Sequence, residues 1–265
     1  HFVSPSIWAW RGGRIHKIHR SVDHMLCLFP FEPKLYHDHG IAATFVGHPL
    51  ADTIPLEVPR AQARASLGLD EQTPVVAILP GSRRGEVLHN TPAFLQTVAL
   101  LSRQRPDLRF VLPVVPGLRD MVEPMVREHA PDAPLTLLDG RSHEALAACD
   151  VTLIASGTAT LEAALFKRPM VIAYKISGLS WQIMKRMAYL PWVGLPNILL
   201  SDSVVPERLQ DEANPAQLAA DVLAWLDQPA RAASVQQRFL ELHHQLKQDT
   251  ARAASDAIAQ VLETR

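Results

Sequence analysis

The sequence has little cysteine, no excess of charge of either sign and no long apolar run. Of its 265 residues only 2 are cysteine, Cys27 and Cys149, which give neither a disulfide framework nor a metal-ligand pattern and fit a reducing compartment. Lys and Arg total 26 against 27 Asp and Glu, so no overall field attracts nucleic acid. No apolar run approaches the roughly 18 residues that cross a membrane, and no signal peptide opens the chain. We therefore expect a globular protein that neither spans a membrane nor binds nucleic acid.

Two common nucleotide-binding motifs are also missing. The segment 80–85, Pro-Gly-Ser-Arg-Arg-Gly, lacks the Gly-Lys-Ser/Thr ending of a P-loop. It also lacks the three spaced glycines of the dinucleotide fingerprint. These absences argue against an ATPase and against a dehydrogenase.

Short apolar runs alternate with helical stretches along most of the chain. The predicted strands are 25–29, 43–46, 75–79, 109–115, 135–138, 151–154, 170–174 and 192–195. Helices are expected at 32–39 and, two or more, between Pro215 and Glu263. This alternation predicts an α/β fold with a doubly wound parallel sheet, in which ligands bind beyond the carboxyl ends of the strands.

Three prolines between residues 48 and 59 interrupt this pattern. We therefore expect residues 1–50 to be the remnant of one Rossmann-like domain, residues 51–60 to be an interdomain linker, and residues 61–265 to form a nucleotide-binding domain with carboxyl-terminal helices. The chain opens with His rather than Met, and residues 2–5 look like the end of a strand entering a loop. An amino-terminal part of the first domain is expected to be missing.

Residues 155–162 join a predicted strand directly to a predicted helix through small and hydroxyl side chains. Ser156, Gly157 and Thr158 would present free backbone N–H groups and the positive helix end to a phosphate. Glu162, about one turn further, would accept hydrogen bonds from two sugar hydroxyls. In the alternative interpretation, Ser156 or Thr158 is an ordinary N-cap and Glu162 a solvated first-turn acid.

The predicted strand 75–79 runs into a second loop of the same design. Gly81 and Gly85 permit a close backbone approach, and Ser82 offers a hydroxyl. Arg83 and Arg84 offer planar forks of donors for phosphate oxygens. An ordinary surface turn can carry the same residues. Two such loops at the ends of two predicted parallel strands favour a nucleotide site.

Two segments combine aromatic and basic side chains without any acid. Residues 1–20 contain four Lys and Arg, and residues 163–201 contain five. Such a composition is typical of interfacial helices that meet acyl chains and anionic headgroups, although an amphipathic stripe is also typical of a protein core. The residues we expect to contact lipid or membrane are Trp8, Trp10, Arg11, Trp181, Lys185 and Arg186.

The chain resembles one known family nearly from end to end. The resemblance lies in motifs at 4–6 (Ser-Pro-Ser), 8–11 (Trp-Ala-Trp-Arg), 29–32 (Phe-Pro-Phe-Glu), 46–50 (Val-Gly-His-Pro-Leu), 79–86 (Leu-Pro-Gly-Ser-Arg-Arg-Gly-Glu), 156–162 (Ser-Gly-Thr-Ala-Thr-Leu-Glu) and 195–197 (Leu-Pro-Asn). Together and in this order they are similar to lipid-A-disaccharide synthase. That family has the two-domain GT-B fold, and its amino-terminal, acceptor-side domain is longer than residues 1–50.

This resemblance implies inverting glycosyl transfer in lipid A (lipopolysaccharide) biosynthesis. UDP-2,3-diacylglucosamine would be the donor and 2,3-diacylglucosamine 1-phosphate the acceptor, giving lipid A disaccharide 1-phosphate and UDP. It implies a cytoplasmic Gram-negative enzyme at the inner-membrane surface, with a homodimer as one expected assembly. The family's general base is an aspartate upstream of His1, so the chain alone is expected to be inactive.

The resemblance also points to donor-binding residues. They are Gly81, Ser82, Arg83, Ser156, Gly157, Thr158, Glu162 and Asn197. The diphosphate would lie between the two loops, the ribose on Glu162 and the uracil near residues 138–141. Because Arg83 and a helix N-terminus can stabilise the departing UDP, we expect neither a metal nor a cofactor.

Two further residues carry an ordinary structural interpretation beside the functional one. Asn197 would contact the donor sugar or phosphate, or would simply be a turn residue after Pro196. His48 stands in a Gly-His-Pro turn, where we expect structural hydrogen bonding rather than catalysis.

Two other functions stay open. One is a different UDP-sugar enzyme of the same fold, such as an N-acetylglucosaminyltransferase or an epimerase, which a water-soluble acceptor or no acceptor at all would reveal. The other is a non-catalytic nucleotide-binding module, which an absence of turnover after restoring the upstream sequence would reveal.

Overall fold

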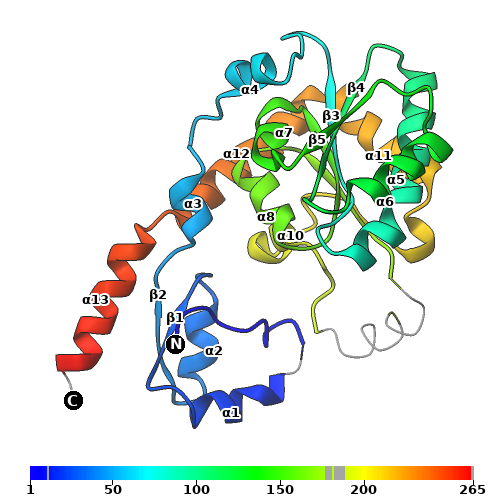
Figure 1. The fold of residues 1–265 in the computed structure, drawn as a ribbon. Helices are drawn as coiled ribbons and strands as arrows, with labels where there is room; N and C mark the ends of the chain where they lie inside the picture. Colours follow the sequence, from blue (N-terminus) through cyan, green and yellow to red (C-terminus); the bar gives the residue numbers. More distant parts are fainter. Residues whose placement is uncertain (11, 177–180, 182–188, 264–265) are drawn as a thin grey trace. The chain divides into compact units, whose positions relative to one another are not determined.

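The computed structural model describes residues 1–10, 12–176, 181 and 189–263 (Figure 1). The chain divides into two compact units. Unit 1 comprises His1–Pro55, Trp181–Pro191 and Leu240–Arg265, and unit 2 comprises Leu56–Ser180 and Trp192–Phe239.

Unit 2 is built on six parallel strands in the order β5-β4-β3-β6-β7-β8. They are β3 (Val75–Leu79), β4 (Arg109–Val114), β5 (Leu135–Asp139), β6 (Val151–Ala155), β7 (Met170–Tyr174) and β8 (Glu207–Leu209). Every residue of β3 and β6 is buried, as expected for strands covered on both faces. The chain proceeds from β3 to one side of the sheet and from β6 to the other. The strand order therefore reverses between β3 and β6.

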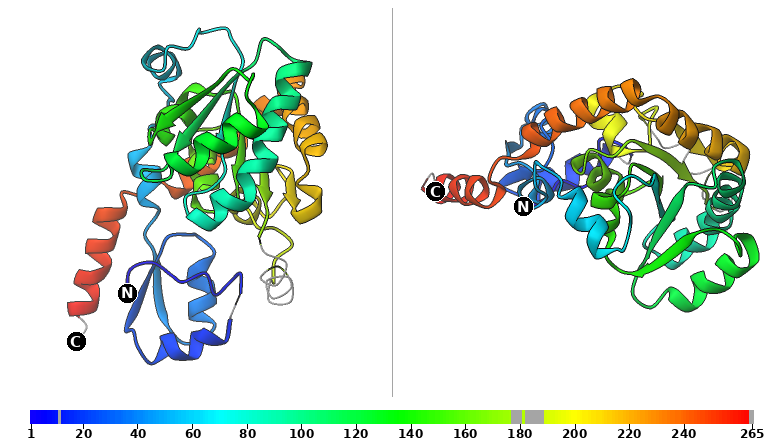
Figure 2. Two further views of the ribbon diagram at one scale, coloured as in Figure 1. Left: turned by 45° about the vertical axis from the view of Figure 1, so that its right-hand side comes forward. Right: turned by 90° about the horizontal axis from the view of Figure 1, so that it is seen from above.

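Helices cover both faces of this sheet (Figures 1 and 2). One layer contains α5 (Arg84–Gln104), α6 (Arg119–His129) and α11 (Pro215–Asp227), with α5 contacting both others. The opposite layer contains α4 (Arg60–Ser66), α7 (Ser142–Ala148), α8 (Thr158–Leu165) and α10 (Leu195–Leu200), which contact one another in sequence. The short η2 (Gln210–Glu212) follows β8, and α12 (Pro229–Leu246) follows α11. This is the layered arrangement that the alternating sequence pattern predicted.

Unit 1 contains a small βαβ element and the carboxyl-terminal helix. Its elements are η1 (Gly12–Arg14), α1 (Ile15–His19), β1 (His24–Cys27), α2 (Glu32–His37), β2 (Ala42–Phe45), α3 (Pro49–Thr53) and α13 (Thr250–Glu263). Strands β1 and β2 are parallel, with Cys27 opposite Phe45. On α13, Ala257 packs in one buried cluster with Leu26 and Val46.

The two units differ from the predicted domains in two segments. Of the described residues, 181, 189–191 and 240–263 belong to unit 1, whereas the sequence pattern assigned them to the nucleotide-binding domain. Asp52 is one reason, because its carboxylate accepts the backbone N–H groups of Asp249 at 3.1 Å and Thr250 at 2.7 Å. These bonds join residues almost 200 positions apart, so local periodicity carries no trace of them. Helix α3 also occupies part of the expected linker.

Most predicted strands are confirmed, but one is wrong. Strands β3 and β7 have the predicted bounds, and β1, β2, β4, β5 and β6 agree within two residues. The segment 192–195 is not a strand, because Gly194 caps α10, whose first turn contains Pro196. The sixth strand is β8, three half-buried residues paired to β7 at the sheet edge. Its charged residues Glu207 and Arg208 leave no apolar run to detect.

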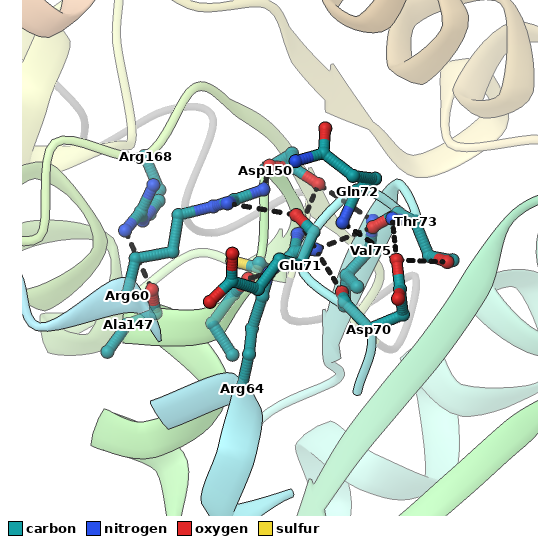
Figure 3. A network of polar contacts seen from close by, with 12 residues as sticks. Arg60, Arg64, Asp70, Glu71, Gln72, Thr73, Val75, Ala147, Asp150 and Arg168 are labelled. Atoms are coloured by element: carbon teal, nitrogen blue, oxygen red, sulfur yellow. Dashed lines mark hydrogen bonds and ion pairs between the residues drawn. The ribbon is translucent and has the colours of Figure 1, made fainter. Parts of the chain in front are cut away.

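The amino ends of β3 and β6 are tied together by a polar network around Arg64 (Figure 3). Arg64 is fully buried, and its Nη2 lies 2.8 Å from Asp150 Oδ2, which also accepts Val75 N–H. The other Arg64 N–H groups donate to the backbone carbonyls of Asp70, Glu71, Thr73 and Ala148. Arg60 pairs with Asp150 Oδ1, and buried Arg168 donates to two carbonyls of the α7 end. This network closes the amino end of the sheet.

None of the helices in these described ranges is both long and apolar enough to cross a bilayer.

Candidate functional site

A pocket of about 340 Å³ lies at the carboxyl ends of β3, β4 and β6, where the strand order reverses. Ligands of open parallel sheets bind at this place, and the volume lies within the usual range for ligand pockets. The lining residues are Leu79, Gly81, Ser82, Arg83, Glu86, Pro113, Val115, Ser142, Ala155, Ser156, Gly157, Thr158, Ala159 and Glu162. The structure thus brings together both predicted loops and Glu162, but not Asn197.

The loop before α8 leaves its helix end open. Gly157 is the N-cap, with φ 150° and ψ −168°, a conformation that strains any residue with a Cβ. No side chain in the part of the chain that the structure describes accepts the backbone N–H of Gly157, Thr158 or Ala159. Thr160 instead turns its hydroxyl back to the Gly157 carbonyl at 2.7 Å. An anion in the pocket can therefore accept these N–H groups.

The loop before α5, by contrast, is capped by its own side chain. Glu86 Oε2 accepts the backbone N–H groups of Ser82 at 3.1 Å and Arg83 at 3.3 Å. Glu86 Oε1 accepts a hydrogen bond from Arg83 Nη1 at 2.7 Å. Gly81 has φ 128°, and a Cβ there would lie 2.5 Å from the Glu86 Cβ, so this loop requires glycine. Two loops that look alike in sequence thus present different groups to the pocket.

Glu162 lines the pocket from α8, one turn after the open helix end. Its Oε2 lies 3.3 Å from His143 Nε2, and its side chain is 21% exposed. The His143 ring packs edge-on against Phe166, with centroids 5.3 Å apart. A carboxylate has about four lone-pair sites, so Glu162 keeps capacity to accept hydroxyl groups.

Asn197 is fully buried and does not line the pocket. Its amide is bonded to residues 204–207 instead. Its Nδ2 donates to the Val205 carbonyl at 2.9 Å and to Glu207 Oε1 at 2.8 Å. Its Oδ1 accepts the N–H groups of Val204 and Val205. Since both polar atoms of the amide already have two partners, this arrangement differs from the expected contact with sugar or phosphate.

Glu207 extends this support to the end of β6. It accepts the N–H groups of Val193 at 2.8 Å and Gly194 at 3.0 Å, and burial raises the pKa of its carboxyl group. Ser156 then donates its hydroxyl to the Val193 carbonyl at 2.9 Å. Asn197 and Glu207 therefore act behind the pocket, by holding residues 193–194 against Ser156.

Several further lining positions, four of them named here, were missed or only approached from the sequence. Pro113 and Val115 are apolar residues at the end of β4, where nothing in the pattern separates them from the core. Ser142 immediately follows the segment 138–141 that was expected near uracil. Glu86 carried a usable signal, because it stands three residues after the N-cap Arg83, at capping-box spacing.

The predicted lipid-contact residues are only partly described. Arg11, Lys185 and Arg186 lie outside the described residues. In unit 1, Trp8 donates its indole N–H to the buried carboxylate of Glu32 at 2.9 Å, and its ring packs edge-on against two phenylalanines. Trp10 is 43% exposed, and Trp181 is half-buried. Lipid contact stays a prediction for all of them, with a structural role evident for Trp8.

His48 has the structural role that we expected. It is buried, and its Nδ1 accepts the Leu50 N–H at 3.2 Å, which caps α3. Its ring stacks on Phe29, with centroids 5.8 Å apart. Burial lowers the pKa of His48 to about 4, so the imidazole is neutral at neutral pH.

No group of three or more His, Cys, Asp or Glu within the described residues is arranged to hold a metal ion. Both cysteines are buried and unpaired with each other, and burial raises the pKa of Cys27 and Cys149 to about 12. These thiols are therefore protonated packing residues. Metal independence stays a prediction.

Comparison with known proteins identifies the family. A family model described as lipid-A-disaccharide synthetase matches residues 1–261. The chain belongs to this family. A curated lipid-A-disaccharide synthase of Albidiferax ferrireducens is 58% identical over 99% of this chain and 69% of its own length. One of Paraburkholderia phymatum is 53% identical over 100% of this chain and 68% of its own length. This confirms the predicted family, a glycosyltransferase family of lipid A biosynthesis.

Solved structures confirm the fold of this lipid-A-disaccharide synthetase family member. Anabaena HepE in complex with UDP and glucose matches with a TM-score of 0.54 and 14% identity. The match covers 96% of this chain and 66% of the HepE chain. UDP-GlcNAc 2-epimerase of Neisseria meningitidis bound to UDP-GlcNAc has a TM-score of 0.58 and 11% identity, and covers 91% of this chain and 62% of its own. At these identities the likeness establishes the parallel-sheet, GT-B type fold.

Proposed function

We propose that unit 2 binds the UDP moiety of UDP-2,3-diacylglucosamine. The enzyme would transfer the sugar to the 6-hydroxyl of 2,3-diacylglucosamine 1-phosphate, releasing lipid A disaccharide 1-phosphate and UDP. The family supports the identity of these substrates. The observation that carries the binding step is the open amino end of α8 in the pocket at the reversal of strand order.

The two loops would bind the diphosphate through different groups. The backbone N–H groups at Gly157 and Thr158 are available to phosphate oxygens, whereas those at Ser82 and Arg83 already bond Glu86. The first loop therefore contributes the Arg83 guanidinium, and the second contributes its backbone. Each charge-assisted hydrogen bond contributes about 1.5–3 kcal/mol.

The nucleoside would occupy the rest of the pocket. Glu162 would accept the ribose hydroxyls, as other carboxylates accept vicinal diols. Uracil would then lie toward Ser142 and Val115, which line the pocket beyond Glu162 at the ends of β5 and β4. Backbone groups and apolar side chains there suit a flat, uncharged base.

The same groups support the chemical step. Negative charge develops on the departing UDP, and the α8 helix end together with Arg83 would stabilise it without a metal or a cofactor. The general base in this proposal is the aspartate that the family resemblance implies upstream of His1. By this proposal the chain alone has no turnover.

We also propose where in the cell the enzyme acts. Both substrates carry acyl chains, so we propose a cytoplasmic enzyme peripherally associated with the inner membrane, with Trp10 among the contacting residues. Sedimentation with anionic vesicles at low and high salt tests this association. A homodimer stays part of the proposal, to be tested by the sedimentation coefficient of the protein.

Calorimetry with UDP, ADP and NAD tests the binding step. We expect UDP to bind in preference to the other two, and both Glu162→Ala and Arg83→Ala to weaken UDP binding about tenfold or more, the size of a lost charge-assisted hydrogen bond. Arg84→Ala is the matched control, because it removes the same charge next to Arg83 but outside the pocket lining. A folded chain that prefers NAD, or that loses no more affinity with Arg83→Ala than with Arg84→Ala, would contradict the proposal.

A further inference from the structure

We propose that Glu86 is a positioning residue for Arg83. The Glu86 carboxylate holds the Arg83 guanidinium in place at the pocket before a phosphate binds. The proposal rests on the proposed function, because it assumes a phosphate-bearing ligand in this pocket. Glu86 itself touches no reacting atom in this scheme. It acts only through Arg83.

Glu86 is held firmly enough to serve as an anchor. Its side chain is 13% exposed, and Oε2 is bonded to two backbone N–H groups of the loop, at Ser82 and Arg83. Gly81 makes room for it, since any Cβ at Gly81 would collide with the Glu86 side chain. The position of Oε1 is therefore set by the backbone of the loop.

Arg83, in contrast, has little packing of its own. Its side chain is 83% exposed, so without a tether it would sample many rotamers, and ordering these on binding would cost affinity. The bond from Nη1 to Glu86 Oε1, at 2.7 Å, restricts this freedom. Nη2 and Nε keep their donors for phosphate oxygens.

A competing role for Glu86 is that of an internal anion that phosphate must displace. The structure favours positioning, because the Glu86 carboxylate completes the cap of α5, while the open end of α8 offers phosphate a separate place in the same pocket. The two roles make opposite predictions. Removing the charge of Glu86 weakens UDP binding if Glu86 positions Arg83, and strengthens it if Glu86 competes with phosphate.

The variant Glu86→Gln separates these roles. Glutamine keeps the size of the side chain and an oxygen that accepts the two backbone N–H groups, but its amide nitrogen cannot accept a bond from the guanidinium. We expect a loss of UDP affinity of about twofold to fivefold, the scale of one exposed ion pair. Uridine, which has no phosphate, should bind as it does to the unmodified chain. The effect on UDP should vanish in an Arg83→Ala background.

A second measurement needs no ligand. Nitrogen-15 relaxation of the Arg83 Nε–H group should report greater mobility in Glu86→Gln than in the unmodified chain. The control is Glu123→Gln, because Glu123 forms a comparable exposed pair with Arg119 on α6, at 2.6 Å, and neither residue lines the pocket. This control should leave both UDP affinity and the Arg83 signal unchanged.

The results that overturn the proposal are distinct from those that overturn the proposed function. Equal or tighter UDP binding by Glu86→Gln, an equal loss for uridine, an effect that persists without Arg83, or unchanged mobility of Arg83 would each refute positioning. If the unmodified chain does not bind UDP more tightly than uridine, the proposed function fails instead. The relaxation measurement still decides whether Glu86 holds Arg83.

Discussion

The two ends of the six-stranded sheet in unit 2 use charged side chains in opposite ways. At the amino ends of β3 and β6, Arg64 is fully buried and its guanidinium bonds Asp150 and four backbone carbonyls. At the carboxyl ends of the same strands, Arg83 is 83% exposed and bonded through a single Nη1 contact to Glu86. The arginine at the amino end therefore has hydrogen-bond partners on all its guanidinium nitrogens, whereas the arginine at the carboxyl end keeps most of its donors for a ligand.

This difference has a physical origin. A buried charge is tolerated only where every polar group around it finds a partner, so Arg64 and its neighbours must be complete in the folded protein. A site that binds an anion must instead keep donors unused until the ligand comes. We therefore expect changes at the amino end to affect stability, and changes at the carboxyl end to affect binding.

The largest expected effect breaks the amino end. Arg64→Met removes the hydrogen bonds of a fully buried guanidinium to four backbone carbonyls and to Asp150, which keeps Arg60 and the Val75 N–H as partners. The loss of these bonds should lower the free energy of unfolding by about 3–5 kcal/mol. UDP affinity of the molecules that remain folded should not change. Urea unfolding and calorimetry measure the two quantities.

Arg60→Met is the matched control for this variant. Arg60 bonds the other oxygen of Asp150 at the same 2.8 Å, but its side chain is 38% exposed. Its loss should therefore cost less than about 1 kcal/mol. Equal losses for the two variants would show that burial does not set the importance of these arginines.

A smaller effect is expected from a glycine at the carboxyl end. Gly157→Ala meets no neighbouring atom but must keep φ near 150°, which costs about 1–3 kcal/mol or reorients the α8 N–H groups. We expect a modest loss of stability together with a clear loss of UDP affinity, measured by the same two methods.

Gly68→Ala sharpens this test. Gly68 also has a positive φ, 66°, and open space around it, but it lies outside the pocket lining. It should lose stability by about 1–2 kcal/mol without losing UDP affinity. If both glycine variants bind UDP normally, the open end of α8 is not the phosphate site.

The smallest expected effect is a pH dependence of stability that arises from Lys167, three residues before the amino end of β7. Burial, together with the neighbouring charge of Arg168, lowers the pKa of Lys167 from 10.5 to about 8. Between pH 8 and 10.5 the unfolded chain binds this proton more tightly, so the cost of the buried charge fades as the pH rises through this window. Lys167 is half-buried, so we expect this cost to be no more than about 1 kcal/mol. The stability difference between Lys167→Met and the unmodified chain should shift by that amount between pH 8 and 10.5, and a constant difference would refute the assignment.

The sequence by itself determined strands β1 to β7 and both loops of the site. Strands such as β3 and β7 are short, continuous apolar runs, and their burial on both faces is what local composition records. Ser156, Gly157 and Thr158 follow one such strand directly, as Gly81, Ser82 and Arg83 nearly follow another. Since parallel strands end at one edge of a sheet, their meeting in one pocket could be predicted.

Only the tertiary structure decided how these residues are used. The local sequence does not reveal that both polar atoms of the Asn197 amide bond residues 204–207 behind the pocket. It also does not reveal that β8 completes the sheet. The same holds for α13, which joins unit 1 through contacts with residues about 200 positions earlier in the chain. The physical reason is that periodicity reports whether a residue is buried, whereas its hydrogen-bond partners depend on which distant segments the fold brings beside it.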